Sequence, residues 1–140
     1  MIYVIDANVL MSALISGKAF YKTVFNTFDL ITPDFALIEI EKYKQTVATK
    51  SKLNDEQMRR FTFDLFRRLT ILPNYFLTTA SLTEAGSLIG EAAPNDISYL
   101  ALALQTDSVL LTRDRPIYVA ARQKGFRKIV MFDDFLRAYN

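Results

Sequence analysis

Two hydrophobic patterns alternate along the chain: short continuous apolar runs, and longer segments in which apolar residues recur every three or four positions. The short runs lie at residues 2–5, 30–31, 70–72, 109–111 and 129–131. Runs of this length and composition are typical of strands buried on both faces of a parallel sheet. We therefore predict five strands at these places.

The longer segments between the runs predict helices, because their apolar residues share one helical face. Thr32 followed by Pro33 predicts an N-cap and a first helical residue, and Asn54 with Gln57 predicts a capping box. The expected helices span residues 8–15, 19–28, 33 to about 49, 80–90, 96–105, 116–124 and 133–139, and one more, after Asn54, carries Met58, Phe61, Leu65 and Leu69 on one side. Strands that alternate with helices predict an α/β fold, in which helices cover both faces of a central parallel sheet.

The chain has 140 residues, which suits one domain spanning residues 1–140, and no repeat or linker divides it. Its 51% hydrophobic content is enough for a globular core. The N-terminus lacks a basic leader, and no apolar stretch approaches the roughly 20 residues that span a bilayer. We therefore expect a cytoplasmic protein without a membrane partner.

The sequence contains no cysteine and no histidine. The missing cysteines exclude disulfides, zinc–thiolate sites and thiol nucleophiles, and they fit a reducing compartment. The missing histidines exclude imidazole general bases and histidine-bound metals. Any metal must therefore be bound through oxygen, which favours Mg²⁺ or Mn²⁺.

Two of the predicted strands are followed by an aspartate: Asp6 follows the first, and Asp114 comes shortly after 109–111. Sites in parallel α/β sheets form beyond the carboxyl ends of the strands, where both residues belong. Taken singly, an aspartate that caps a helix or a turn explains each of them better. Taken together, on neighbouring strands, they favour a site with a cation, because like charges held close need compensation.

Two further carboxylates belong to predicted helices. Glu39 borders the apolar stripe of its helix, so it can reach inward, although an ordinary boundary glutamate also fits. Asp96 opens a helix that is apolar nearly all round, where the helix dipole alone accounts for a negative charge. Asn8 and Thr112, which neighbour Asp6 and Asp114, are candidates to orient the carboxylates, and capping is an equal alternative.

Basic residues gather in two segments. Residues 42–68 hold eight basic residues against three acidic ones, and residues 113–128 hold six against Asp114 alone. A solvated surface explains most of them, and a rim that attracts phosphates is the functional alternative. Arg113 and Arg115, beside Asp114, are the candidates for contacts to a substrate phosphate.

These residues together resemble the motifs of the PIN domain family. The segment Asp6-Ala7-Asn8-x-Leu10 resembles the opening motif, and Glu39 matches the acidic residue on the helix after the second strand. Asp96, at the head of an alanine-rich helix, and the segment Thr112-Arg113-Asp114 resemble the third and fourth motifs. The resemblance covers essentially the whole chain in order, and the length suits the small toxin-like PIN ribonucleases of the VapC type.

The resemblance implies a strand order of 3-2-1-4-5 and a metal-dependent nuclease. It implies that Asp6, Glu39, Asp96 and Asp114 are the catalytic acids that hold Mg²⁺ or Mn²⁺. It further implies RNA as the substrate, an antitoxin protein as a partner, and a homodimer. Many relatives carry another acid just after the fourth motif, where this chain has residues 115–117 (Arg-Pro-Ile), so we expect weaker binding of a second metal.

Three alternatives stay open at this point. The first is a PIN-like protein-binding module with weak or no catalysis, which the absent fifth acid favours and the four retained acids disfavour. The second is a phosphatase of the haloacid dehalogenase type, which needs an aspartate where this chain has Asn8. The third is a nucleotide-binding fold, which is disfavoured because neither a Gly-x-Gly-x-x-Gly segment nor a P-loop is present.

Overall fold

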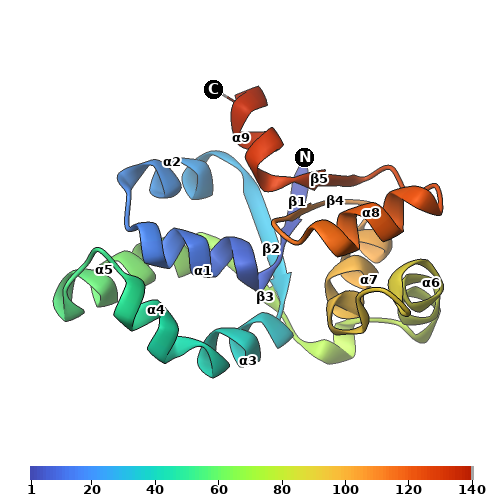
Figure 1. Cartoon of the computed structure of the whole chain (residues 1–140), viewed down its shortest axis with the longest axis horizontal. Helices are drawn as coiled ribbons and strands as arrows, with labels where there is room; N and C mark the ends of the chain where they lie inside the picture. The colour runs from blue at the N-terminus through green and yellow to red at the C-terminus, as the bar shows by residue number, and fades with distance from the viewer. Residues whose placement is uncertain (140) are drawn as a thin grey trace.

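Five parallel strands form one sheet in the order β3-β2-β1-β4-β5 in the computed structural model, which describes residues 1–139 (Figure 1). The strands are β1 (Ile2–Ile5), β2 (Asp29–Pro33), β3 (Leu69–Leu72), β4 (Val109–Thr112) and β5 (Ile129–Met131). The predicted α/β class, the parallel sheet and the strand order are therefore confirmed. Asn140, where the expected domain ends, lies outside the described residues.

Helices cover both sides of the sheet, with α1, α2 and α5 on the left of Figure 1 and α6, α7 and α8 on the right. Their bounds are α1 (Ala7–Ser16), α2 (Ala19–Thr27), α3 (Phe35–Lys42), α4 (Lys44–Lys50), α5 (Asp55–Phe66), α6 (Thr79–Ile89), α7 (Ile97–Thr106), α8 (Arg115–Gln123) and α9 (Phe132–Tyr139), with the short 3₁₀ turns η1 (Asn74–Phe76) and η2 (Pro94–Asp96). Most of them lie within a residue or two of the predicted ranges. The predicted capping box of Asn54 and Gln57 is present at the start of α5.

The prediction that Thr32 and Pro33 start a helix is wrong. Pro33 is the last residue of β2, paired with Leu72 of β3, and the Asp34 backbone N–H donates the next bond to the Leu72 carbonyl. The Thr32 hydroxyl donates to the Ile5 carbonyl at 2.8 Å, so it serves the sheet and caps no helix. Proline is tolerated here because it stands at the end of its strand.

The helix predicted from residue 33 to about 49 is in fact two helices. The backbone leaves helical geometry at Tyr43 (φ −106°, ψ 15°), where α3 ends and α4 begins. The break turns the chain, so that Tyr43, Thr46 and Val47 line the cavity described below together with Glu39. Leu69, expected on the preceding helical face, instead opens β3, because α5 ends at Phe66.

Helix α7 is the most deeply buried helical segment of the fold. Its residues 99–103 are at most 1% exposed, and the helix packs against β1, β2 and β4. This burial follows from its composition, since Tyr-Leu-Ala-Leu-Ala leaves no polar face for water. The helix is therefore a rigid support for residues at its ends, one of which is Asp96.

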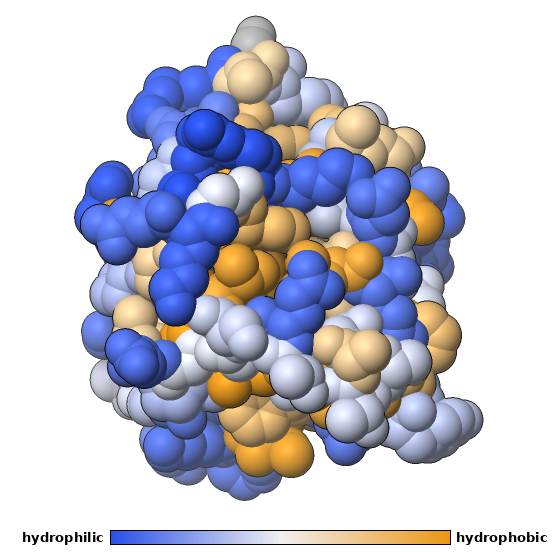
Figure 2. Space-filling view, turned by 90° about the vertical axis from the view of Figure 1, so that its right-hand side faces the viewer, coloured by the Kyte–Doolittle hydropathy of each residue, from blue (hydrophilic) through white to orange (hydrophobic). Residues whose placement is uncertain are grey.

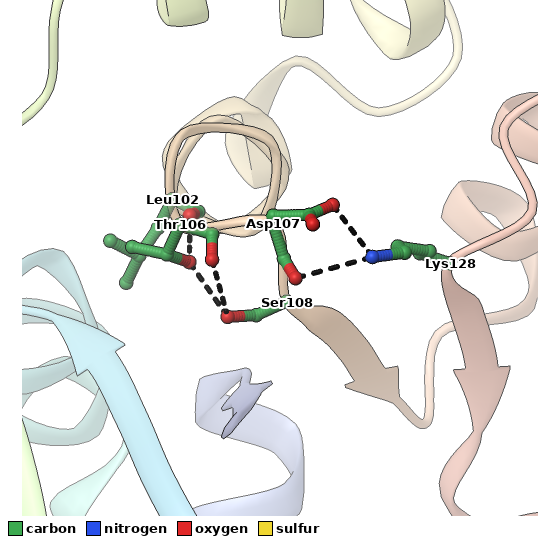
Figure 3. Close-up of polar contacts among 5 residues, drawn as sticks. All are labelled: Leu102, Thr106, Asp107, Ser108 and Lys128. Atoms are coloured by element: carbon green, nitrogen blue, oxygen red, sulfur yellow. Dashed lines mark hydrogen bonds and ion pairs between the residues drawn. The ribbon is translucent and has the colours of Figure 1, made fainter. Parts of the chain in front are cut away.

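A tight turn joins α7 to β4 at the edge opposite the candidate site (Figure 3). Asp107 adopts the left-handed conformation (φ 52°), and the Lys128 ammonium donates both to its carboxylate at 2.6 Å and to its backbone carbonyl at 3.2 Å. The Thr106 hydroxyl donates to the Leu102 carbonyl at 2.7 Å and shares a hydrogen bond with Ser108. After the turn, β4 runs back along α7.

The lengths of α7 and β4 then bring their far ends together. Ten helical residues rise about 15 Å, and four strand residues rise about 13 Å. Because α7 ends and β4 begins at the same turn, Asp96 before α7 and Asp114 after β4 lie at the same edge of the sheet.

Exposed apolar side chains belong to several separate elements. Ile38 of α3, Phe63 of α5 and Tyr75 of η1 are at least 64% exposed. On the face over α6 and α8, hydrophobic residues lie between hydrophilic ones (Figure 2). The expected homodimer stays a prediction. Among the described residues, none of the helices has the length and apolar character needed to cross a bilayer.

The burial of α7 predicts a large cost for truncating it. Leu100→Ala should lower the free energy of unfolding by about 3 kcal/mol, because the site cannot collapse around the lost atoms. The matched variant Leu37→Ala, at a position that is 42% exposed, should cost less than about 0.5 kcal/mol. Urea denaturation of both variants measures the difference, and equal costs would contradict the central role of α7.

Candidate functional site

Asp6 and Asp114 lie side by side at the carboxyl edge of the sheet. Asp6 follows β1 and Asp114 follows β4, and these strands are neighbours that pair Ile5 with Leu111. Asp6 is only 4% exposed and caps α1, where its Oδ1 accepts the Val9 backbone N–H at 2.9 Å. The predicted proximity of the two aspartates is therefore present, and the capping alternative for Asp6 holds at the same time.

Thr112 links the two aspartates. Its hydroxyl donates to Asp6 Oδ2 at 2.5 Å and accepts the Asp114 backbone N–H at 3.0 Å. The side chain is fully buried at the end of β4, so its rotamer is fixed by the sheet. Thr112 therefore contacts a carboxylate and also caps the turn to Asp114, which are the two roles that the sequence left open for it, whereas no hydrogen bond of Asn8 to a carboxylate is found among the described residues.

Glu39 reaches the site from α3 and is held there by a tyrosine. The Tyr99 hydroxyl, on α7, donates to Glu39 Oε1 at 2.5 Å. Tyr99 is completely buried, and its pKa is raised above the ordinary value by burial first and then by the hydrogen bond and charge of Glu39. The phenol is thus a neutral donor. It contacts Glu39 Oε1 and leaves Oε2 for other partners.

Tyr99 is a residue of this site that the sequence analysis did not assign to it. One signal was available, because Tyr99 stands three residues after Asp96, so both belong to the same side of the helix start. A second signal was its hydroxyl, since a buried phenol usually finds a hydrogen-bond partner. The partner itself lies 60 residues away on α3, which no local pattern reveals.

Asp96 occupies the N-cap position of α7, one residue before the first helical turn in which it was expected. Its side chain caps no backbone N–H of that helix, which leaves the carboxylate available to the cavity it lines. Burial raises the pKa of Asp96 to about 7, and the charge and hydrogen bond of Asp114 and the charges of Asp6 and Glu39 act in the same direction.

Asp6 shows the same electrostatic crowding. Burial raises its pKa to about 6, and the charges of Asp114 and Glu39 add to the effect. The hydrogen bonds from Thr112 and from the Val9 backbone oppose it. Glu39 and Asp114 therefore lie close enough to Asp6 and Asp96 for their charges to disfavour the ionised forms of these two aspartates.

A cavity of about 620 Å³ opens in front of these groups. The charged lining residues are Glu39, Asp96, Arg113 and Asp114, and the uncharged polar ones are Asn8, Ser12, Thr46 and Asn95. The apolar and weakly polar lining comprises Met11, Ile15, Tyr43, Val47, Ala92, Ala93, Pro94 and Pro116. The cavity thus offers both charged and apolar groups to a ligand.

The two arginines expected to meet phosphate differ in position. Arg113 lines the cavity, and its guanidinium lies 3.8 Å from Asp133, a distance at which a half-exposed pair is weak. Arg115 is exposed on the first turn of α8 and does not line the cavity. The geometry therefore favours Arg113 over Arg115.

The donor chemistry of the site fits a hard divalent cation. All four acids offer carboxylate oxygens, and burial first and then neighbouring negative charges raise the pKa values of Asp6 and Asp96, so a cation would stabilise their ionised forms. Within residues 1–139, however, no group of three or more acidic side chains is arranged closely enough to hold a metal.

Comparison with known proteins finds one matching family model and several similar solved structures. A family model described as PIN domain matches residues 4–129, whereas no curated protein matches the sequence. PAE2754 from Pyrobaculum aerophilum has a similar solved structure, with a TM-score of 0.67 and 17% identity over 99% of this chain and 97% of that one. VapBC2 from Rickettsia felis is also similar, with a TM-score of 0.58 and 18% identity over 94% and 98%. At these identities the two comparisons show a similarity of fold alone.

The crowded carboxylates predict an unusual dependence of stability on pH. Because the folded-state pKa of Asp96 is about 7 and its ordinary value is 3.8, folding favours its protonated form. Stability should therefore fall as pH rises from about 4 to about 7. In chelator, Asp96→Asn should melt a few degrees higher than the unmodified protein at pH 8, with a smaller difference at pH 5.

Thermal melts across this pH range measure the effect. The matched variant Glu84→Gln, which removes an exposed charge from α6, should follow the unmodified protein at every pH. If Asp96→Asn lowers the melting temperature at pH 8 in chelator, the ionised Asp96 carboxylate stabilises the fold, which contradicts the proposed crowding of negative charges.

Proposed function

The chain belongs to the PIN domain family, and on that premise we propose that it is a metal-dependent endoribonuclease, the toxin of a toxin–antitoxin pair. PIN domains are generally metal-dependent nucleases, and the choice of RNA, of the metal and of the biological role is the proposal. The observation that carries it is the meeting of Asp6, Glu39, Asp96 and Asp114 at one edge of the sheet, from four different elements. Such a polyanionic cluster has little use without a cation.

We assign the metal to these four carboxylates, and we propose Mg²⁺ or Mn²⁺ because every available donor is oxygen. When bound, the cation would act as a Lewis acid that stabilises charge on the phosphate and on the leaving oxygen. Thr112 would hold Asp6 in place, and Asn8, on the cavity wall, would orient the carboxylates through its amide.

Water is the proposed nucleophile, because the chain has neither histidine nor cysteine. Attack by water with departure of the 3′ oxygen would leave 5′-phosphate and 3′-hydroxyl ends. The cavity suits single-stranded RNA, since its apolar lining residues would pack against an unpaired base and its charged lining residues would meet the backbone. Arg113 is the proposed phosphate contact, with Arg115 further out.

An antitoxin is the proposed partner. The similar structure of VapBC2 from Rickettsia felis, solved with a DNA fragment from their promoter, supports this proposal by analogy of fold. A homodimer and a cytoplasmic location complete the proposal, and both stem from the family resemblance and the sequence.

A protein-binding module with weak or no catalysis is the second candidate. It is favoured by the spacing of the acidic side chains, none of which form a closed group of three in the described part of the chain. Calorimetric titration with Mn²⁺ separates the two candidates. A nuclease should bind the ion through the acids, whereas a pure scaffold has no reason to do so.

Removing single acids should abolish cleavage and preserve the fold. Asp6→Asn and Asp96→Asn should each lower Mn²⁺-dependent RNA cleavage by roughly 100-fold or more, because each removes a metal-binding charge. Glu84→Gln should retain full activity, and chelator should abolish RNA cleavage by every variant. Cleavage of mixed RNAs is measured beside circular dichroism, and full activity of a folded, pure Asp96→Asn protein would refute the assignment.

Arg113 should matter for RNA affinity. In a cleavage-deficient Asp96→Asn background, Arg113→Ala should weaken RNA binding about three- to tenfold and lower the slope of log K against log salt by about 1. Arg127→Ala, which removes an exposed arginine outside the cavity, is the matched control. Fluorescence anisotropy at several salt concentrations measures both, and equal effects of the two substitutions would contradict a specific phosphate contact.

A further inference from the structure

We propose that Tyr99 is a positioning residue, which fixes Glu39 in the metal site by donating its hydroxyl hydrogen to one carboxylate oxygen. The inference rests on the proposed function, since it assigns a role within the same site. It concerns a residue that touches neither substrate nor metal, and that acts only through Glu39.

The two partners differ greatly in how firmly the fold holds them. Tyr99 lies in the fully buried stretch of α7, which packs against three strands. Glu39 lies on α3, an eight-residue helix with Ala36 as its buried residue and a break at Tyr43. The 2.5 Å hydrogen bond thus ties a loosely anchored carboxylate to the most rigid helix of the molecule.

Anchoring matters because a free glutamate side chain samples many rotamers. Fixing such a side chain on a ligand costs conformational entropy. The Tyr99 hydroxyl removes much of this freedom before the ion arrives, which is how hydrogen-bonded neighbours of metal ligands raise affinity. A phenylalanine would fill the same space in the core, so the hydroxyl contributes the contact with Glu39 and little to the packing.

The same arrangement recurs on the other side of the site. Thr112, buried at the end of β4, donates to one oxygen of Asp6, also at 2.5 Å. Two buried hydroxyls from neighbouring elements thus each orient one acid. In both cases the donor is neutral, so it directs the carboxylate without cancelling the negative charge that attracts the ion.

The test compares metal binding by Tyr99→Phe and by the unmodified protein. Calorimetric titration with Mn²⁺ alone, without RNA, should show about tenfold weaker binding by Tyr99→Phe. Tyr21→Phe is the matched control, because Tyr21 is also buried, at 8% exposure, and stacks on Phe132 away from the acids. Its affinity for Mn²⁺ should equal that of the unmodified protein.

A double variant shows whether Tyr99 acts through Glu39. Tyr99→Phe should weaken binding no further when Glu39→Gln is already present, because the effect passes through that carboxylate. A melt in chelator checks that Tyr99→Phe is folded. If that variant does not fold, the same comparison is made on Glu39→Gln and Glu39→Asp, whose shorter side chain loses the phenol contact and should bind the ion as weakly as Glu39→Gln.

The outcomes separate the inference from the proposed function. Unchanged Mn²⁺ affinity of Tyr99→Phe, or an equal loss in the Glu39→Gln background, overturns the positioning role while the metal site stands. If Glu39→Asp and Glu39→Gln are compared instead, near-normal Mn²⁺ affinity of Glu39→Asp overturns the positioning role as well. Absence of Mn²⁺ binding by the unmodified protein overturns both the inference and the nuclease assignment.

Discussion

Repulsion among neighbouring carboxylates, of which Asp6 is buried, is the constraint on which the functional account depends. Asp6 is only 4% exposed and Asp96 lies close to Asp114, and burial together with neighbouring charges raises the pKa of both Asp6 and Asp96. A fold gains nothing in stability from such a cluster. Functional sites are where strongly shifted carboxyl groups accumulate, and an oxygen-binding cation would relieve the repulsion.

The fold creates this cluster through the way α7 and β4 are joined. The turn at Asp107, braced by Lys128, sends the strand back along the helix (Figure 3). Similar lengths of helix and strand then place Asp96 and Asp114 together at the carboxyl edge, where Asp6 already lies. The apolar residues of α7 therefore stabilise the core, while its N-cap residue Asp96 lines the cavity.

Local patterns were sufficient for the elements and for the positions of the strand-borne acids. Asp6 and Asp114 could be placed because a parallel sheet collects the carboxyl ends of its strands at one edge. The start of α3 was mispredicted because Thr32-Pro33 has the local form of a helix N-terminus, while the pairing with β3 is a long-range interaction. Tyr99 was not assigned to the site for the same reason, since its partner Glu39 is distant in sequence and close only after folding.

The site residues themselves follow from the family resemblance and from geometry, and a metal soak tests them most directly. In a crystal grown with Mn²⁺, anomalous scattering should show a peak within about 2.2 Å of carboxylate oxygens of Asp96 and Asp114, with Asp6 and Glu39 turned toward it. A peak elsewhere on the molecule, or none at millimolar Mn²⁺ and neutral pH, would contradict the account.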